Sequence, residues 1–481
     1  MAGRINVKNL KRGVSYLKRN GISSAYYKAM ERLLRDDDEA DYDKQVRESI
    51  LSSEEIIRQK QTVFDRNYLI SIIVPAYNPD PDSFCRLLES VAAQTYTNWE
   101  LCIVDASTTS SVMPMVHSFI ARHGLDRDKR GNLVDYKRRV KYEHLERNRG
   151  ISINTNEALK MAGGQYIALL DHDDALTRDA LYEVVKAINK KKVRFIYSDE
   201  DKVSYDDGNY FDHHKKTDYD PAMLLTNNYV CHLTVVETEL ARQVGGFNPE
   251  FDGSQDYDFI LRCFEAISPE EIVHIPKVLY HWRSSKASTA ENPESKMYAY
   301  DAGISAVKAH LSRCGIDAEL TLSEHLGFAN VTFKEAGYTV KRMSRKEYEA
   351  LDRDGFESIL EEMILVLDDD LAASLDAQKL LLGPMCLPYA GAVTGKILKN
   401  GTIESCGYER IKGGGVKPCF AGMNPHYSGY LHRAMLLRCV DAFDNGCVMY
   451  KKAALTWDTD GTRLSDGYRC IYEPKAVFTR K

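Results

Sequence analysis

Acidic residues directly follow several of the most apolar segments of this sequence, and their types and spacing could do chemistry. In YIALLDHDDAL (166–176), a run of core-type residues ends in Asp171, His172, Asp173 and Asp174. Carboxylates this close repel one another, and they are costly near a core unless a cation neutralises them. Oxygen-only ligand sets suit Mg²⁺ or Mn²⁺ and usually also hold phosphates. The alternative is helix capping, because acids are common in the first turn of a helix.

The elements that would position these acids form a β-α-β rhythm. Apolar, β-branched runs at 69–77, 99–107, 165–171 and 195–201 indicate buried strands, and helical patterns lie between them. This alternation predicts an α/β fold with a mainly parallel sheet covered on both faces. Ligands of such sheets bind beyond the carboxyl ends of the strands. Asp105, the cluster 171–174 and residues 199–201 all follow such ends, so we expect one site to collect them.

Composition excludes several other classes of protein. The chain has 481 residues, enough for two or three domains, and a net charge of −6, which gives no case for nucleic-acid binding. Its eleven cysteines include no CxxC pair, so a disulfide framework or a zinc ribbon is not expected. No run of residues resembles a membrane span or a signal peptide, and we therefore expect a cytoplasmic protein.

The N-terminus differs from the rest of the chain. Residues 1–35 contain many Lys and Arg residues, with Glu31 as the one acid, and apolar residues recur at roughly helical spacing. This pattern predicts a basic amphipathic arm on an anionic membrane surface, and a solvated helix packed on the main domain is the alternative. An acidic segment and a further helical stretch extend this N-terminal region to residue 66.

A set of motifs carries a resemblance to a known family. SIIVPAYN (71–78), ESVAAQTYTNWELCIVDAS (89–107), GQYIALLDHDDAL (164–176), GGFNPEFDGSQDYDFILRC (245–263) and LYHWR (279–283) occur in family order. The segment 67–322 resembles the family 2 glycosyltransferases, which implies the GT-A fold with a mixed, mainly parallel sheet. Residues 218–233 resemble the subgroup that builds bacterial surface polysaccharides.

The resemblance implies a nucleotide-sugar site. Pro75, Tyr77 and Asp105 fall where the family holds the base and ribose, and Arg149 is a candidate contact to base or phosphate. Asp199 and Asp201 are further candidate contacts to the donor sugar or the acceptor, although a solvated sheet edge would explain them equally well.

It also implies a metal and a base. Asp171 and Asp173 match the family's DxD pair for Mn²⁺ or Mg²⁺, with Asp173 the more direct ligand. His281 falls where some members supply a further metal ligand, and a packed histidine is its alternative. Asp256 matches the catalytic base, and capping of the following helix is the alternative. The adjacent His213 and His214 are interpreted as surface residues.

Two departures from the family pattern affect these roles. The family often has two acids where this chain has Asp105-Ala106, which leaves the donor base open. Its usual Glu-Asp pair is Gln255-Asp256 here, which removes a like charge that would raise the pKa of the base.

Residues 323–481 repeat the second half of this plan. EEMILVLDDDLAASLDAQKLLL (361–382) follows the order of the strand, acids and helix around 165–190, and three later segments match in sequence. The copy lacks a nucleotide half and an equivalent of Asp256, and Phe478 replaces His281. We therefore expect a truncated, catalytically inert GT-A-like module that docks a glycan, forms a homodimer or braces the first domain.

The resulting hypothesis is an inverting, metal-dependent glycosyltransferase acting on a glycan or lipid-linked glycan at the cytoplasmic face of the membrane. UDP is the default nucleotide of the donor, and dTDP is possible. The alternative is a non-catalytic subunit that binds a glycan or a nucleotide sugar. A sugar-1-phosphate nucleotidyltransferase would need a Gly-rich loop after the first strand, and PAYNPDP contains no glycine.

Overall fold

The computed structural model describes Tyr26 and residues 42–127, 135–204, 208–284, 297–334, 337–373, 375–411, 413–458 and 461–481. Apart from Tyr26, the predicted membrane-binding arm (residues 1–35) lies outside this range. The described chain divides into two compact units. The first runs from Tyr42 to Tyr219 and from Asn228 to His310, and the second contains Asp220–Asn227 and Leu311–Lys481. None of the described helices is both long and apolar enough to cross a membrane.

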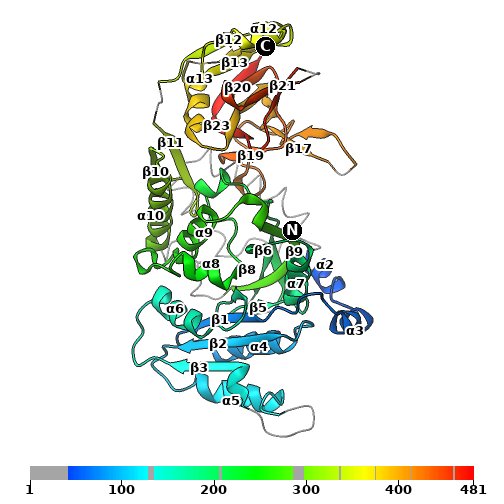
Figure 1. The fold of residues 1–481 in the computed structure, drawn as a ribbon, viewed down its shortest axis with the longest axis vertical. Coiled ribbons are helices and arrows are strands. Elements are labelled where there is room, and N and C mark those ends of the chain that lie inside the picture. The colour runs from blue at the N-terminus through cyan, green and yellow to red at the C-terminus, as the bar shows by residue number, and fades with distance from the viewer. Residues whose placement is uncertain are drawn as a thin grey trace. The chain divides into compact units, whose positions relative to one another are not determined.

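The first unit is built on a mixed sheet in the strand order β3-β2-β1-β4-β8-β6-β9-β5, with β7 paired to β6 (Figure 1). Its elements are α2 (Tyr42–Glu48), α3 (Ser53–Gln61), β1 (Ile70–Ala76), α4 (Pro81–Ala92), β2 (Trp99–Asp105), α5 (Val112–Arg122), β3 (Val140–His144), α6 (Ile151–Met161), β4 (Tyr166–Leu169), β5 (Ala175–Leu176), α7 (Ala180–Lys190), β6 (Phe195–Ser204), β7 (Tyr210–His214), β8 (Thr234–Glu237), α8 (Thr238–Gln243), α9 (Gln255–Glu265), β9 (Ile272–Ser284) and α10 (Met297–Arg313).

The predicted strands are confirmed. β1, β2, β3 and β4 are parallel, and every residue of β1 and β2 is buried, which explains their unbroken apolar sequences. β8 runs antiparallel between β4 and β6, so the sheet is mixed. The carboxyl ends of β1, β2, β4 and β6 therefore lie along one edge.

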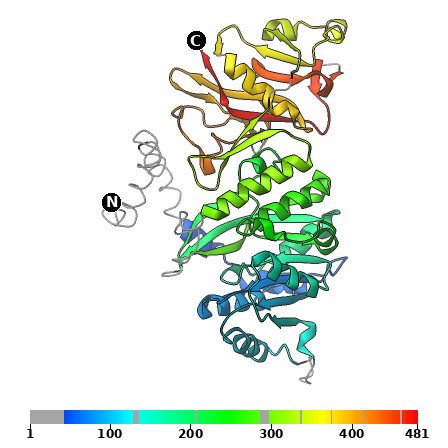
Figure 2. The same cartoon turned by 90° about the vertical axis from the view of Figure 1, so that its left-hand side faces the viewer.

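Helices cover both faces of this sheet. α4 begins at Pro81 after the N-cap Asp80, whose side chain accepts a hydrogen bond from the Ser83 amide, and it buries Phe84 and Leu87. α4, α5 and α7 share one hydrophobic core with the sheet, whereas α6 packs on β1 and β2 separately from that core. α9 and α10 run side by side (Figure 2). This packing holds the strand ends rigidly, as a site built on them requires.

The second unit has its own sheet, in the order β12-β13-β20-β15-β23-β14, with β16 paired to β15. Its elements are β10 (Ala318–Leu322), β11 (Ala329–Phe333), β12 (Val340–Met343), α11 (Arg345–Glu349), α12 (Arg353–Glu357), β13 (Met363–Leu367), β14 (Leu371–Ala373), α13 (Leu375–Leu382), β15 (Ala390–Lys399), β16 (Thr402–Ser405), β17 (Tyr408–Arg410), β18 (Val416–Pro418), β19 (Arg438–Val440), β20 (Cys447–Lys451), β21 (Leu455–Asp458), β22 (Gly461–Leu464) and β23 (Arg469–Arg480).

This second sheet repeats part of the first. Its order matches β1-β4-β8-β6-β9-β5 strand for strand, and each pair of neighbours has the same parallel or antiparallel sense. In the described part of the second unit, no strand corresponds to β2 or β3. The sheets therefore support an internal duplication in which, among the described residues, the strands corresponding to β2 and β3 are missing.

The core of the second unit contains an acid that should titrate near neutral pH. Glu473 in β23 is buried, and its carboxylate accepts a hydrogen bond from the Lys475 amide at 3.0 Å. Burial raises the pKa of Glu473 from 4.5 to about 7. The folded state therefore holds this proton more tightly than the unfolded chain does, and stability falls as the pH rises from about 4.5 to 7.

Replacing Glu473 with Gln should remove this pH-dependent loss. We expect Glu473→Gln to raise the free energy of unfolding by up to about 3 kcal/mol at pH 8 and to change it little at pH 4.5, measured by chemical denaturation. The exposed Glu349 of the same unit provides a control, because Glu349→Gln should have little effect at either pH. Equal effects of Glu473→Gln at both pH values would contradict this account.

Candidate functional site

The loops that follow β1 and β2 are tied together at the sheet edge. The Asn78 amide donates to Ser107 Oγ at 2.8 Å, and the Thr108 amide donates to Asn78 Oδ1 at 3.0 Å. Tyr77 stands on the first of these loops with 43% of its surface exposed. An exposed tyrosine at a braced strand end offers a face to a planar ligand, as predicted for the nucleotide base.

Asp105 closes the end of β2 and is buried. Its Oδ1 accepts the Ser107 amide at 2.9 Å, and its Oδ2 accepts the Tyr142 hydroxyl at 2.7 Å. His144 Nδ1 lies 3.5 Å from the same Oδ2. Tyr142 and His144, both in β3, fix the carboxylate beside the loop of Tyr77. Tyr77 and Asp105, two of the three residues predicted to hold the base and ribose, therefore share one edge.

The DHDD loop (Asp171–Asp174) follows β4, and its last acid, Asp174, anchors it to β9. Asp174 is fully buried and accepts the Tyr280 hydroxyl at 2.5 Å and the Arg283 amide at 2.8 Å. Burial raises the pKa of Asp174 well above its usual range. His172 donates from Nδ1 to the Pro75 carbonyl at 3.3 Å, which joins the loop to β1. Asp174 and His172 therefore anchor the loop.

The other two acids of the loop are more exposed than Asp174. The side chain of Asp171 is about half exposed, and Asp173 is partly buried. Burial and the neighbouring charge of Asp171 raise the pKa of Asp173. Two carboxylates that repel each other at a sheet edge are the donor set that a hard divalent cation would neutralise. Asp171 and Asp173 thus fit the predicted metal.

Asp256 lies in the first turn of α9, so the capping alternative describes part of its setting. Its Oδ2 accepts the Asn228 side-chain amide at 2.8 Å. Burial raises the pKa of Asp256, the charge of His232 lowers it, and that of Asp171 raises it. Asp256 therefore lies within electrostatic reach of Asp171 and His232.

His232 contacts Asp171 and was missed by the sequence analysis. Its Nε2 lies 3.6 Å from Asp171 Oδ2, and its Nδ1 lies 3.2 Å from Glu200 Oε2. Burial alone would lower the pKa of His232, but these two carboxylates hold it well above its usual value. The signal available in the sequence was a lone histidine in NNYVCHL, 32 residues after its partner Glu200.

Glu200 is itself buried and neutralised. Lys216 Nζ lies 3.4 Å from its Oε2, and His214 Nδ1 lies 3.1 Å from its Oε1. Although burial opposes ionisation, Lys216, His214 and His232 hold the pKa of Glu200 well below its usual range. His213 and His214 are partly buried rather than surface residues, so their interpretation from the sequence was wrong.

Asp199 and Asp201 lie within β6, which continues to Ser204, so the prediction that they follow the end of the strand is wrong. Both are buried, so the alternative of a solvated edge is wrong as well. Asp199 accepts the Lys216 amide at 2.9 Å and His274 Nε2 at 2.8 Å. Through these bonds, Oδ1 of Asp199 links β6 to β9. The predicted contact of Asp199 to the donor sugar stays a prediction.

His281 donates from Nδ1 to Asp201 Oδ1 at 2.6 Å, and Tyr42 donates to the other oxygen at 2.8 Å. Metal-ligating histidines commonly use such a carboxylate to orient the ring, so this setting fits the predicted role. Among the described residues, however, the ligand atoms of Asp171, Asp173 and His281 do not all lie within 4.8 Å of one another. His281 as a third ligand therefore stays a prediction.

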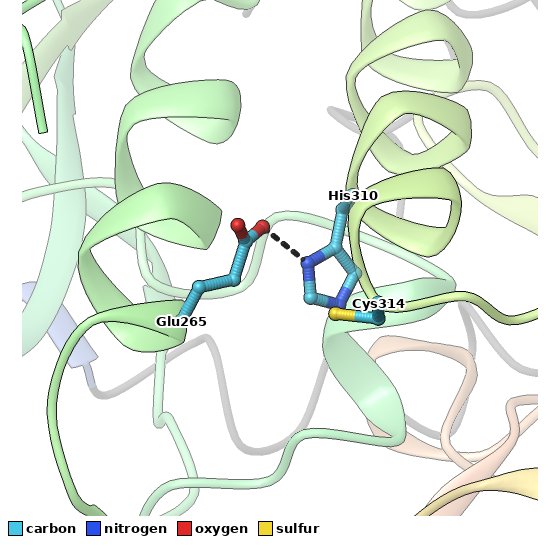
Figure 3. Close-up of side chains that lie close together, drawn as sticks. All are labelled: Glu265, His310 and Cys314. Carbon is cyan, nitrogen blue, oxygen red and sulfur yellow. Dashed lines mark hydrogen bonds and ion pairs between the residues drawn. The ribbon is translucent and has the colours of Figure 1, made fainter.

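Two further features lie around the cluster. Arg149 precedes α6 and is exposed, and its guanidinium pairs with Glu157 at 2.9 Å, from which a phosphate could attract it. At the far end of α9, Glu265 accepts a hydrogen bond from His310 of α10 at 2.7 Å (Figure 3). This second pair joins two helices and shares no residue with the acidic cluster.

In the second unit, arginine side chains contact the acids that follow β13, the strand that corresponds to β4. Arg480, at the end of β23, lies 2.9 Å from Asp370, 3.0 Å from Asp444 and 2.7 Å from Glu404. Arg345 joins Asp368 at 2.8 Å. Arginine side chains of the chain itself therefore neutralise the acids that follow β13, which supports the inert role predicted for this module.

Comparison with known proteins agrees with the motifs. Residues 71–240 match the model of the family described as Glycosyl transferase family 2, which spans β1 to β8 and stops before Asp256 and His281. The first unit accordingly has the GT-A fold that the sequence predicted.

Two relatives align with about half of this chain. The uncharacterized protein y4gI of Sinorhizobium fredii (strain NBRC 101917 / NGR234) is 42% identical over 247 residues, 51% of this chain and 26% of that protein. The O-antigen biosynthesis protein RfbC of Myxococcus xanthus is 31% identical over 257 residues, 53% of this chain and 19% of that protein. The chain thus spans about a quarter or less of the length of these relatives.

Among solved structures, residues 1–349 of S. aureus TarS in complex with UDP-GlcNAc resemble the chain with a TM-score of 0.38 and 19% identity. That likeness covers 49% of this chain and 66% of the other.

Proposed function

We propose, from the premise that residues 71–240 form a glycosyl transferase family 2 domain, that this chain is an inverting, metal-dependent glycosyltransferase of surface-polysaccharide assembly. Its donor would be a nucleotide-diphosphate sugar, with UDP as the default nucleotide and dTDP as the alternative. Its acceptor would be a hydroxyl of a glycan, lipid-linked at the inner face of the membrane. The name of the Myxococcus relative, an O-antigen biosynthesis protein, supports this class of product.

One observation carries the proposal: the segment 228–232 contacts both Asp171 and Asp256. His232 Nε2 lies 3.6 Å from Asp171 Oδ2, and the Asn228 side-chain amide donates to Asp256 Oδ2 at 2.8 Å. The carboxylates that bind the metal and diphosphate and the carboxylate that accepts the proton must lie around the same sugar. Asp171, Asp173 and Asp256 would fill these roles.

Asp256 and the pair Asp171 and Asp173 would have different roles in the reaction. The acceptor oxygen would form a bond to the anomeric carbon while the bond from that carbon to the diphosphate oxygen breaks. Asp256 would take the hydroxyl proton, and displacement from the opposite face inverts the anomeric configuration. A divalent cation held by Asp171 and Asp173 would supply charge stabilisation for the leaving diphosphate.

A binding screen tests the donor site directly. We expect one nucleotide sugar to raise the melting temperature of the protein only when Mn²⁺ or Mg²⁺ is present, because the diphosphate binds through the ion. Asp173→Ala should abolish this shift. Glu265→Gln, at the remote end of α9, should keep it. A shift that survives Asp173→Ala would place the diphosphate elsewhere, and no shift with any nucleotide sugar would favour a glycan-binding subunit.

A further inference from the structure

We propose that His232 is a positioning residue that fixes the Asp171 carboxylate for the metal–diphosphate group of the donor. The inference rests on the proposed function and deepens it, because it assigns a task to a side chain outside the DxD pair and the base.

The first argument is the way the imidazole joins two carboxylates. Nδ1 faces Glu200 Oε2 at 3.2 Å, and Nε2 faces Asp171 Oδ2 at 3.6 Å. The ring therefore lies between the two carboxylates, with Glu200 at hydrogen-bond distance and Asp171 at ion-pair distance. The backbone amide of His232 donates to the same Glu200 oxygen at 3.1 Å, which fixes the residue at two points.

The second argument is the support given to the faces of the ring. His232 stacks on Tyr280 with 4.6 Å between ring centroids and 17° between planes. The Tyr280 hydroxyl donates to Asp174 and also accepts the Asp171 amide at 3.3 Å. The stacked pair therefore contacts the DHDD loop at the Asp171 backbone, the Asp171 carboxylate and Asp174.

The third argument concerns charge. Asp171 and Asp256 repel each other, yet both must be ionised for binding and proton transfer. The charge of His232 lowers the pKa of Asp256, whereas that of Asp171 raises it. The other anchor of His232, Glu200, also lies 3.4 Å from Lys216 Nζ and 3.1 Å from His214 Nδ1, so His232 is one of three basic side chains around it.

His214 offers a matched control. It also binds Glu200, at 3.1 Å, and both histidine side chains are about four-fifths buried. His214 lies in β7 and contacts Oε1 of Glu200, whereas His232 contacts Oε2 and Asp171. Loss of either histidine should disturb Glu200, whereas loss of His232 alone should release the Asp171 carboxylate.

The test compares His232→Gln, His232→Phe and His214→Gln in the full chain. Mn²⁺ affinity in the presence of UDP is measured by the loss of the free Mn²⁺ signal in electron paramagnetic resonance, and unfolding is followed separately. We expect both His232 variants to bind Mn²⁺–UDP about 10- to 100-fold more weakly, as found for residues that orient metal ligands. His232→Phe retains the stacking on Tyr280, so its fold should persist. His214→Gln should bind within about twofold of the wild type.

The outcomes separate the two proposals. Equal losses in the His232 and His214 variants would make His232 a general support of the fold and would overturn the inference. Wild-type affinity in His232→Phe would overturn it as well. A wild-type chain that binds neither Mn²⁺–UDP nor any nucleotide sugar in the screen would instead refute the proposed function, and the inference with it.

Discussion

Asp256→Asn is expected to reduce sugar transfer roughly 10²- to 10⁴-fold while the metal-dependent binding of the donor persists. The asparagine is isosteric, and its carbonyl oxygen can still accept the Asn228 amide, but it cannot take the proton of the acceptor hydroxyl. Asp256 stands at the start of α9, where a negative charge is favoured, so a small loss of stability should accompany the change. Initial rates of transfer, with donor binding measured alongside, check this expectation.

The control is Glu265→Gln at the other end of the same helix, which should leave transfer near the wild-type rate. Transfer in Asp256→Asn above about a tenth of that rate would assign the proton to another group. Because burial raises the pKa of Asp256, transfer by the wild type should fall on the acidic side at a higher pH than the usual range of aspartate.

Much of the fold could be predicted because its signals are local. The strands predicted at 69–77, 99–107, 165–171 and 195–201 were found at Ile70–Ala76, Trp99–Asp105, Tyr166–Leu169 and Phe195–Ser204. Continuous β-branched sequences identify buried strands because both of their faces must be apolar. The order of the motifs identified the GT-A fold, and strand order β12-β13-β20-β15-β23-β14 supports the predicted duplication.

The missing parts of the site depend on contacts between distant segments. Nothing near His232 in the sequence indicates that Glu200 of β6 will hold its ring, or that Lys216 will neutralise Glu200. A prediction based on acids near the ends of strands treats Asp199 and Asp173 alike. In the structure, Asp199 is buried against His274, whereas Asp173 is only partly buried. The burial of Asp199 depends on the packing of β6 against β9, which the local sequence pattern does not encode.

The second unit shows why acids alone do not define a metal site. The sequence predicted that LVLDDD (365–370) was inert because companion motifs were missing, but it gave no reason for the acids to persist. In the structure, Arg480 contacts Asp370, Asp444 and Glu404 and is 11% exposed. Arg480 thus neutralises carboxylates in the second unit, which is the role proposed for a bound cation beside Asp173.

Arg480→Met is therefore expected to destabilise the second unit strongly. Removal of one partner from a largely buried ion-pair network typically costs 3–5 kcal/mol, and the partial exposure of Asp370 argues for about 3 kcal/mol here. The loss arises because Asp370, Asp444 and Glu404 keep their charges without the guanidinium. It should therefore shrink as the pH falls toward 4, where carboxylates take up protons. Chemical denaturation at pH 7.5 and pH 4 measures both quantities.

Arg353→Met supplies the comparison. Arg353 pairs with Glu357 at 2.8 Å on an exposed helix surface, and such pairs contribute about 0–1 kcal/mol. A loss in Arg480→Met no larger than in Arg353→Met would show that the acids after β13 are solvated rather than neutralised. Millimolar Mg²⁺ should recover part of the stability of Arg480→Met and little of the wild type, because only the variant leaves carboxylates free for the ion. Equal effects of Mg²⁺ on both proteins would refute the substitution of arginine for a cation.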